Sequence, residues 1–121
     1  MSRPPVRIDN LTKKTELATA ARLASNPWSR MVGLLGRRQI ADGEGLVLLP
    51  CSSIHTFFMR FAIDVLYLNR EATVLKVAPS LRPFRFSGVL RHAHYTVELP
   101  VGTIERSNTS PGDRLAITPN Q

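Results

Sequence analysis

The stretch HTFFMRFAIDVLYLN, residues 55–69, decides the fold of this chain, because its second half is apolar on both faces of a strand. After Asp64, the apolar side chains of VLYL, residues 65–68, follow one another without alternation, which is typical of a strand covered on both sides of a sheet. His55, Arg60 and Asp64 interrupt this apolar stretch. Buried charge is costly unless it is paired or useful, so these residues predict either a structural ion pair or the lining of a site.

Short apolar segments separated by turns surround this strand and predict a mostly β domain. We expect further strands at residues 6–11, 16–24, 46–50, 73–81, 95–100 and 114–118, the first two joined as a hairpin. We interpret residues 82–94 as a loop and residues 101–113 as a turn-rich connection. The expected fold is α+β with little helix: a single compact, barrel-like, antiparallel β domain.

One helix is predicted near residues 27–36. Asn26 is a suitable N-cap, and proline is favoured at the first helical position, which Pro27 occupies. At helical spacing the following residues form one apolar stripe, and Gly36 is a suitable terminator; the stripe consists of Trp28, Met31, Val32 and Leu35. We therefore expect the helix to pack on the sheet as part of the core.

The 121 residues fit one domain, 1–121, in which we expect residues 1–5 and 118–121 to fray. No apolar run approaches the roughly 20 residues that span a bilayer, and the first residues lack the apolar core of a secretory signal. Cys51 is the single cysteine, so the fold depends on packing and not on an internal disulfide. These features favour a cytoplasmic protein without membrane contact.

The net charge of +7 comes from 16 lysine and arginine residues against nine acidic residues. The basic residues are spread along the sequence, which is more typical of a solvated surface than of a nucleic-acid-binding stripe. Nucleic-acid binding therefore remains a less favoured alternative, in which Phe84, Phe86 and Tyr95 would stack on bases.

Three segments in this order resemble the bacterial and archaeal family called domain of unknown function 192. They are WSRMVGLLGR (28–37), GEGLVLLPCSSIHTFFMRFAIDVLYLN (43–69) and VELPVGTIERSNTSPGDRL (97–115). The departures are mild: Leu35 replaces a usual methionine, Val101 a usual alanine, the proline that often precedes the family's aspartate is missing, and the turn NREA lacks the usual Asp-Gly. The resemblance implies a compact β-barrel-like fold with one helix and assigns no reaction. It marks His55, Phe57, Met59, Arg60, Asp64, Glu98, Gly102, Gly112 and Asp113.

Six of these residues form the predicted ligand-binding cleft: His55, Phe57, Met59, Arg60, Asp64 and Glu98. On a strand His55, Phe57 and Met59 would share one face, with His55 either at the mouth of a cleft or bonded to a backbone carbonyl. Arg60 and Asp64 would form a structural pair, or Arg60 would bind an anionic group while Asp64 holds it in place. Glu98 would face solvent unless it meets Arg60.

No recognisable catalytic set accompanies these residues. Cys51 with His55 is a weak nucleophile–base pair, and a metal site built from Cys51, His55, His92 and His94 lacks the spacing of known zinc motifs. We therefore expect no cofactor, no metal and a non-enzymatic domain that binds an anionic small ligand or a protein partner. An enzyme that uses His55 with a carboxylate as acid and base is a further alternative.

Overall fold

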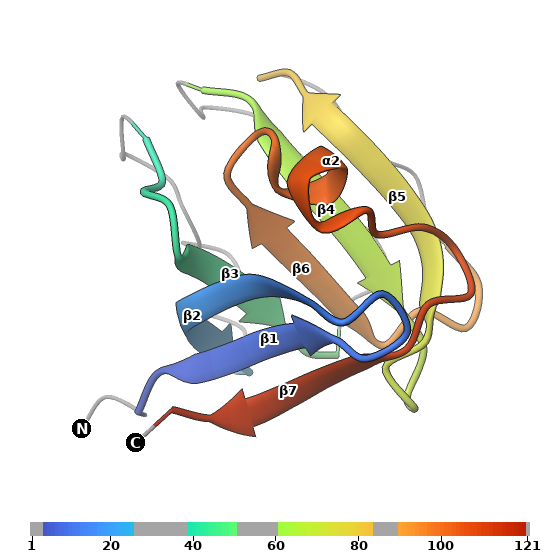
Figure 1. Cartoon of the computed structure of the whole chain (residues 1–121). Coiled ribbons are helices and arrows are strands. Elements are labelled where there is room, and N and C mark those ends of the chain that lie inside the picture. Colours follow the sequence, from blue (N-terminus) through green and yellow to red (C-terminus); the bar gives the residue numbers. More distant parts are fainter. Residues whose placement is uncertain (1–3, 26–38, 51–60, 84–89, 121) are drawn as a thin grey trace.

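Seven strands form one sheet that curls into a half-barrel in the computed structural model, which describes residues 4–25, 39–50, 61–83 and 90–120 (Figure 1). The strand order is β5-β4-β6-β3-β2-β1-β7. The strands are β1 (Val6–Asn10), β2 (Thr15–Ala24), β3 (Glu44–Leu48), β4 (Ile63–Leu68), β5 (Val74–Leu81), β6 (Tyr95–Leu99) and β7 (Leu115–Pro119). The mostly β, barrel-like fold predicted from the sequence is confirmed.

Strand β4 lies inside the sheet, as its continuous apolar pattern predicts. All six of its residues are buried, and it pairs with β5 on one side and β6 on the other. Leu66 and Leu68 point into one apolar cluster, whereas Val65 and Tyr67 point into another. Both faces of β4 are therefore covered by apolar side chains.

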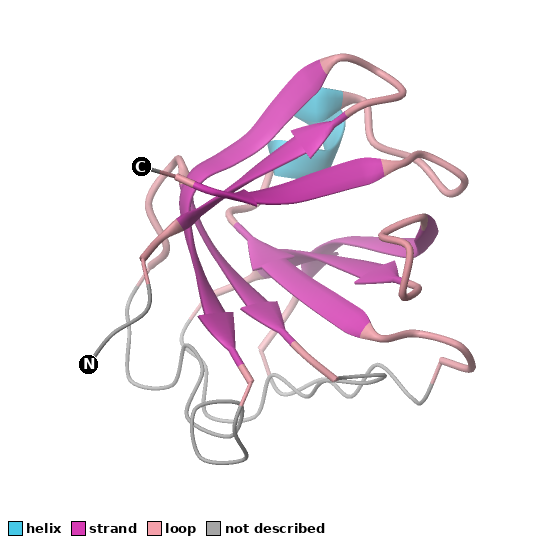
Figure 2. Ribbon diagram, turned by 90° about the horizontal axis from the view of Figure 1, so that it is seen from below, coloured by secondary structure: helices cyan, strands magenta, loops and turns pink. Residues whose placement is uncertain are grey.

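The two apolar clusters lie on opposite faces of the sheet. The inner cluster draws residues from all seven strands and fills the concave side; it includes Ile8, Leu17, Val47, Leu66, Val97, Leu99 and Leu115. The outer cluster lies over β3 and β4; it consists of Ala24, Ile40, Leu46, Leu48, Ile63, Val65 and Tyr67. Figure 2 shows how the sheet bends back on itself, so that strands from its two halves face each other. This curvature encloses the inner cluster.

A short helix, α2 (Thr103–Ser107), lies in the segment that we interpreted as a turn-rich connection, so that interpretation was wrong. Ile104 joins the inner cluster, and its N–H donates to Asp64 of β4, while Arg106 of α2 donates to the Glu16 carbonyl oxygen of β2. Five residues are too few for a helical apolar period to be visible in a sequence. The N-cap residue, Gly102, also has no side chain that could signal a helix start.

The sheet is antiparallel except for one pair of neighbours. β2 and β3 run parallel, with Leu23 opposite Val47, which the prediction of an antiparallel domain did not include. β3 and β4 are both antiparallel to β6 and therefore run in the same direction. The end of β3 and the start of β4, which residues 49–62 join, consequently lie at opposite ends of the sheet.

Two predictions concern the rest of the chain. The predicted helix near residues 27–36 lies outside the described residues. At the C-terminal end, where we expected fraying over residues 118–121, Thr118 pairs with Arg7 and the Asn120 N–H donates to the Pro5 carbonyl oxygen at 2.9 Å. Within the described ranges, no helix is long and apolar enough to cross a membrane.

Candidate functional site

Asp64 receives three backbone hydrogen bonds from two segments remote in sequence. Its Oδ1 accepts from the Ser80 N–H at 2.9 Å, and its Oδ2 accepts from the N–H groups of Gly102 at 3.1 Å and Ile104 at 2.9 Å. The residue is 1% exposed. Asp64 therefore joins β4 to β5 and to the start of α2.

The contact at α2 explains why a carboxylate belongs at this position of β4. The first N–H groups of a helix have no partner within the helix, and a negative group there is favoured. No side chain of the helix itself caps α2, and Gly102 adopts φ 98°, a left-handed conformation that glycine accepts readily. Asp64 supplies the missing cap from across the fold.

Glu98 is buried on β6, which corrects the alternative that it faces solvent. The residue is 5% exposed and lies between Leu46 of β3 and Val65 of β4. Those two neighbours belong to the outer cluster, so Glu98 faces that cluster. The alternation of β6 suggested a solvated face because sequence does not reveal that both faces of an interior strand are covered.

Burial changes the chemistry of the Glu98 carboxyl group. Loss of hydration disfavours the charged form and raises the pKa of Glu98 from 4.5 to about 7. Within the described ranges, no charged neighbour contributes to this pKa. Near neutral pH the group can therefore either donate a hydrogen bond or accept one.

The structure places the two described acidic members of the predicted cleft on opposite faces. Asp64 is opposite Leu99, which belongs to the inner cluster, whereas Glu98 is opposite Val65 of the outer cluster. Neighbouring positions of a strand point to opposite faces, so these carboxyl groups do not line one cavity together. The other four members, His55, Phe57, Met59 and Arg60, lie outside the described residues.

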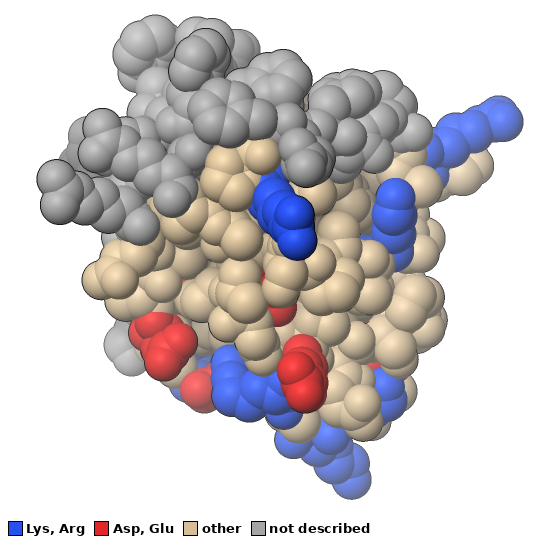
Figure 3. All heavy atoms as spheres, turned by 90° about the horizontal axis from the view of Figure 1, so that it is seen from above, with Lys and Arg blue, Asp and Glu red and all other residues tan. Residues whose placement is uncertain are grey.

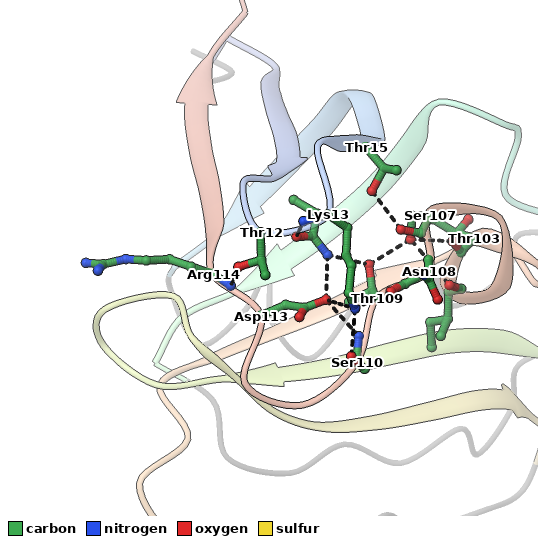
Figure 4. Close-up of polar contacts among 12 residues, drawn as sticks. Thr12, Lys13, Thr15, Thr103, Ser107, Asn108, Thr109, Ser110, Asp113 and Arg114 are labelled. Atoms are coloured by element: carbon green, nitrogen blue, oxygen red, sulfur yellow. Dashed lines mark hydrogen bonds and ion pairs between the residues drawn. The ribbon is translucent and has the colours of Figure 1, made fainter.

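A second polar cluster, around Asp113, gathers beyond the C-terminal end of α2 (Figure 4). The Asp113 carboxylate accepts hydrogen bonds from Asn10 Nδ2 at 2.9 Å, Lys13 Nζ at 3.0 Å and the Ser110 N–H at 3.0 Å. Burial alone would raise the pKa of Asp113, but these hydrogen bonds and the lysine charge outweigh it and lower the pKa. The cluster ties the β1–β2 turn to the loop before β7.

Replacing Lys13 with methionine is expected to lower the free energy of unfolding by about 1 kcal/mol, because the ion pair is partly buried. Lys13 Nζ also donates to the Asn108 carbonyl oxygen and to Ser110 Oγ, so three contacts are lost together. Urea unfolding would measure the loss. Lys14→Met is the control, since Lys14 is exposed and carries the same charge; equal losses in both variants would contradict this role for Lys13.

The sequence and the fold are similar to those of known proteins. The family model DUF192, described as "Uncharacterized ACR, COG1430", matches residues 9–117. The chain belongs to the DUF192 family. A UPF0127 protein of Pyrococcus furiosus is 38% identical over 111 residues, which cover 88% of this chain and 93% of that protein. A UPF0127 protein of Pyrococcus abyssi is 32% identical over 114 residues, 89% of this chain and 94% of that protein.

Two solved structures share the fold. A protein of unknown function from Novosphingobium aromaticivorans has a TM-score of 0.79 at 19% identity, covering 93% of this chain and 83% of that one. A "putative transcription regulator" from Sinorhizobium meliloti has a TM-score of 0.78 at 25% identity, covering 97% and 96%. The expected membership of an uncharacterised family is thus confirmed.

Besides Asp64 and Glu98, the DUF192 resemblance marked three residues that the structure describes, Gly102, Gly112 and Asp113. Gly102 and Gly112 have φ angles of 98° and 94°, so both occupy conformations that favour glycine. Asp113, which from its sequence signalled a turn and nothing more, is 4% exposed and organises the polar cluster. Its partners Asn10 and Lys13 were missed because about 100 residues separate them from Asp113, and no local pattern links them.

Among the residues that the structure describes, the charges of this DUF192 domain form no continuous basic stripe on the face shown in Figure 3, where acidic side chains lie among some of the basic ones. Arg7 contacts Asp9 at 3.2 Å and Glu16 at 2.7 Å. Lys13 is paired with Asp113. Part of the positive charge is therefore neutralised locally.

Proposed function

We propose that this DUF192 protein is a small, non-enzymatic binding domain whose site lies on the outer face of the sheet around Glu98. The observation that carries this proposal is the buried Glu98 carboxyl group, whose pKa of about 7 reflects burial without a compensating charge in the described ranges. Buried polar groups are normally paired. A titratable group perturbed in this way is a candidate for a functional site.

The chain connection around β4 supports the inclusion of four more residues. Phe61, two residues before the start of β4, packs against the outer cluster, the face toward which Glu98 points. We propose that His55, Phe57, Met59 and Arg60, which come just before Phe61, complete the site. Asp64 then supports the site from the other face by fixing β4 to β5 and α2.

An anionic small ligand fits this set best. Arg60 would supply a charged, forked donor, and protonated Glu98 would donate a hydrogen bond to an anionic oxygen. Ionised Glu98 would repel the same ligand. The proposed binding is therefore stronger below pH 7 than above it.

To test the proposal, we would titrate the protein with phosphates and carboxylates at pH 6 and pH 8, while following the His55, Arg60 and Glu98 side-chain NMR signals. We expect saturable shifts at these residues and an affinity about tenfold lower at pH 8, since the carboxyl group ionises near pH 7. For the carboxylates, which are fully ionised at both pH values, Glu98→Gln should retain binding and lose most of its pH dependence. Glu105→Gln, an exposed change on α2, should behave as the wild type.

If none of the phosphates and carboxylates shifts the NMR signals of His55, Arg60 and Glu98, the small-ligand proposal is contradicted. A protein partner would then be the remaining binding mode. An affinity that is independent of pH in the wild type would contradict the role given to Glu98.

Nucleic-acid binding is the second candidate, favoured by the net charge of +7 and by the name of the Sinorhizobium meliloti protein, "putative transcription regulator". The scattered and partly paired basic residues argue against it. Adding short oligonucleotides to the same titration would distinguish the two. Diffuse shifts over many arginine signals, abolished by salt, would favour nucleic acid.

A cytoplasmic location and a bacterial source also belong to this proposal. The location rests on the single cysteine, because small secreted domains commonly depend on several disulfides. The source rests on the family resemblance alone. Fractionation of cells that express the protein from its own gene would test the location.

A further inference from the structure

A polar pocket lies at the end of β4 away from Glu98. Its volume is about 580 Å³, and its lining comes from three separate segments: Pro50, Asn69 to Glu71, and His92 to His94. His94 directly precedes β6, and Glu98 lies four residues further along, so about 13 Å of strand separates the pocket from the proposed Glu98 site. The pocket is therefore a distinct site.

Hydrogen bonds hold the walls of this pocket in place. Asn69 Oδ1 accepts from the N–H groups of Glu71 at 3.0 Å and Thr73 at 2.9 Å, which fixes the turn between β4 and β5. On the facing wall, the His94 N–H donates to the Leu68 carbonyl oxygen at 2.7 Å. The two walls are thus joined through β4.

The two histidines are also held by their surroundings. The His94 ring meets the Tyr95 ring edge to face, with centroids 4.7 Å apart. His92 adopts φ 70°, a left-handed conformation that is uncommon for residues other than glycine. Such conformations cluster at functional sites, where the surrounding structure maintains them. The ring contact of His94 and the backbone conformation of His92 therefore define the positions of both imidazoles in the pocket wall.

Donors predominate in the lining. The Arg70 guanidinium carries five N–H donors, and each imidazole of His92 and His94 can donate at least one hydrogen bond. Glu71 is the acidic residue among the described lining. In the described ranges, no three histidine, cysteine or acidic side chains are grouped so that they could hold a metal ion. The chemistry of this wall is thus better suited to an anion than to a metal.

We propose that this pocket binds the oxyanion group of a small ligand, a phosphate or a carboxylate, through Arg70, His92 and His94. Arg70 provides the forked contact that planar oxyanions prefer, and the imidazoles close the opposite side. Glu71 opposes the anion and lowers the affinity, and because the site is exposed, salt screens these charges. This proposal does not depend on the proposed function.

The test is a titration of the ¹⁵N-labelled full chain with inorganic phosphate and, separately, with succinate, at constant ionic strength set with sodium chloride. We expect saturable shifts of the His92 and His94 side-chain signals that depend on Arg70 and not on the response of the Glu98 signal. Arg70→Ala should weaken binding at least tenfold, and Glu71→Gln should strengthen it severalfold. Arg22→Ala removes the same charge from β2, outside the lining, and should leave the affinity unchanged.

The two titrations distinguish a phosphate ligand from a carboxylate ligand. Saturation by phosphate alone assigns a phosphate ligand, and saturation by succinate alone assigns a carboxylate. Shifts that fail to saturate, or equal weakening by Arg70→Ala and Arg22→Ala, would overturn the pocket as a specific site. Thermal unfolding would check that each variant is folded. We expect all of them to fold, because Arg70 and Glu71 are exposed turn residues.

Discussion

Replacing Asp64 with alanine is expected to lower the free energy of unfolding by about 3 kcal/mol, because three backbone donors lose their acceptor at once. Each unsatisfied buried group costs about 1–3 kcal/mol, although water can partly replace the acceptor where the segment is exposed. The loss also removes the charge that favours the start of α2. The damage should therefore be concentrated where α2 and β5 meet β4.

Two measurements would establish this role. Urea unfolding gives the loss of stability, and amide hydrogen exchange should accelerate most at Ser80, Gly102 and Ile104, the three donors. Asp64→Asn should lower the free energy of unfolding by less, about 2 kcal/mol. Its amide oxygen can still accept from one of the two segments, β5 or the start of α2, but its NH₂ group then faces the N–H donors of the other segment. Asp64→Asn also provides a measurable variant should the alanine variant not fold.

Asp42→Ala is the matched control, since Asp42 lies in an exposed turn and surface substitutions usually change stability by less than about 0.5 kcal/mol. If Asp64→Ala and Asp42→Ala cost the same, or if exchange at the three donors stayed unchanged, the capping role would be wrong.

Strand β4 shows how far a sequence pattern reaches. Its apolar run predicted an interior strand covered on both faces, and the structure confirms this, because all six residues of β4 are buried. Apolar residues at consecutive positions of a strand point to both faces, so the sequence of the strand itself carries this information. The other strands were predictable because each is a short apolar segment that ends at a turn, and both features are visible in the local sequence. The order of strands was not, since the parallel β2–β3 pair depends on which remote segments meet.

For the candidate site, the sequence identified candidate residues but not their partners or their burial. The position of Asp64 in a buried strand indicated a partner, and Arg60 was the near one in sequence. The three described partners are backbone groups 16 to 40 residues away, which carry no side-chain signal. Glu98 was recognised as a candidate, but its burial follows from neighbours on β3 and β4 and not from its own strand.

The second large effect concerns Glu98 and depends on pH. The pKa of Glu98 is about 7 in the folded protein and 4.5 as its ordinary value, so between these values the folded state holds a proton that the unfolded state has lost. Stability therefore falls by about 1.4 kcal/mol for each pH unit across this window. Below it both states are protonated, and above it both are ionised, so the dependence ends at either side.

Glu98→Gln removes this titration and keeps nearly the same shape. We expect the variant and the wild type to have similar stabilities at pH 4 and the variant to be more stable by roughly 3 kcal/mol at pH 8, as the difference between the two pKa values implies. Urea unfolding from pH 4 to pH 8 would measure it. Glu105→Gln, on the exposed side of α2, should follow the wild type at every pH.

The sign of the stability difference between Glu98→Gln and the wild type at pH 8 shows whether the Glu98 carboxylate is unpaired or paired. If Glu98→Gln stabilises the protein, the ionised carboxyl group is buried without a sufficient counter-charge, and protonation relieves that cost. If Glu98→Gln instead destabilises the protein at pH 8, the carboxylate is ionised and paired, and Arg60 is the first partner to test. A double-mutant cycle with Arg60→Met would then measure a coupling, which an unpaired Glu98 would not show.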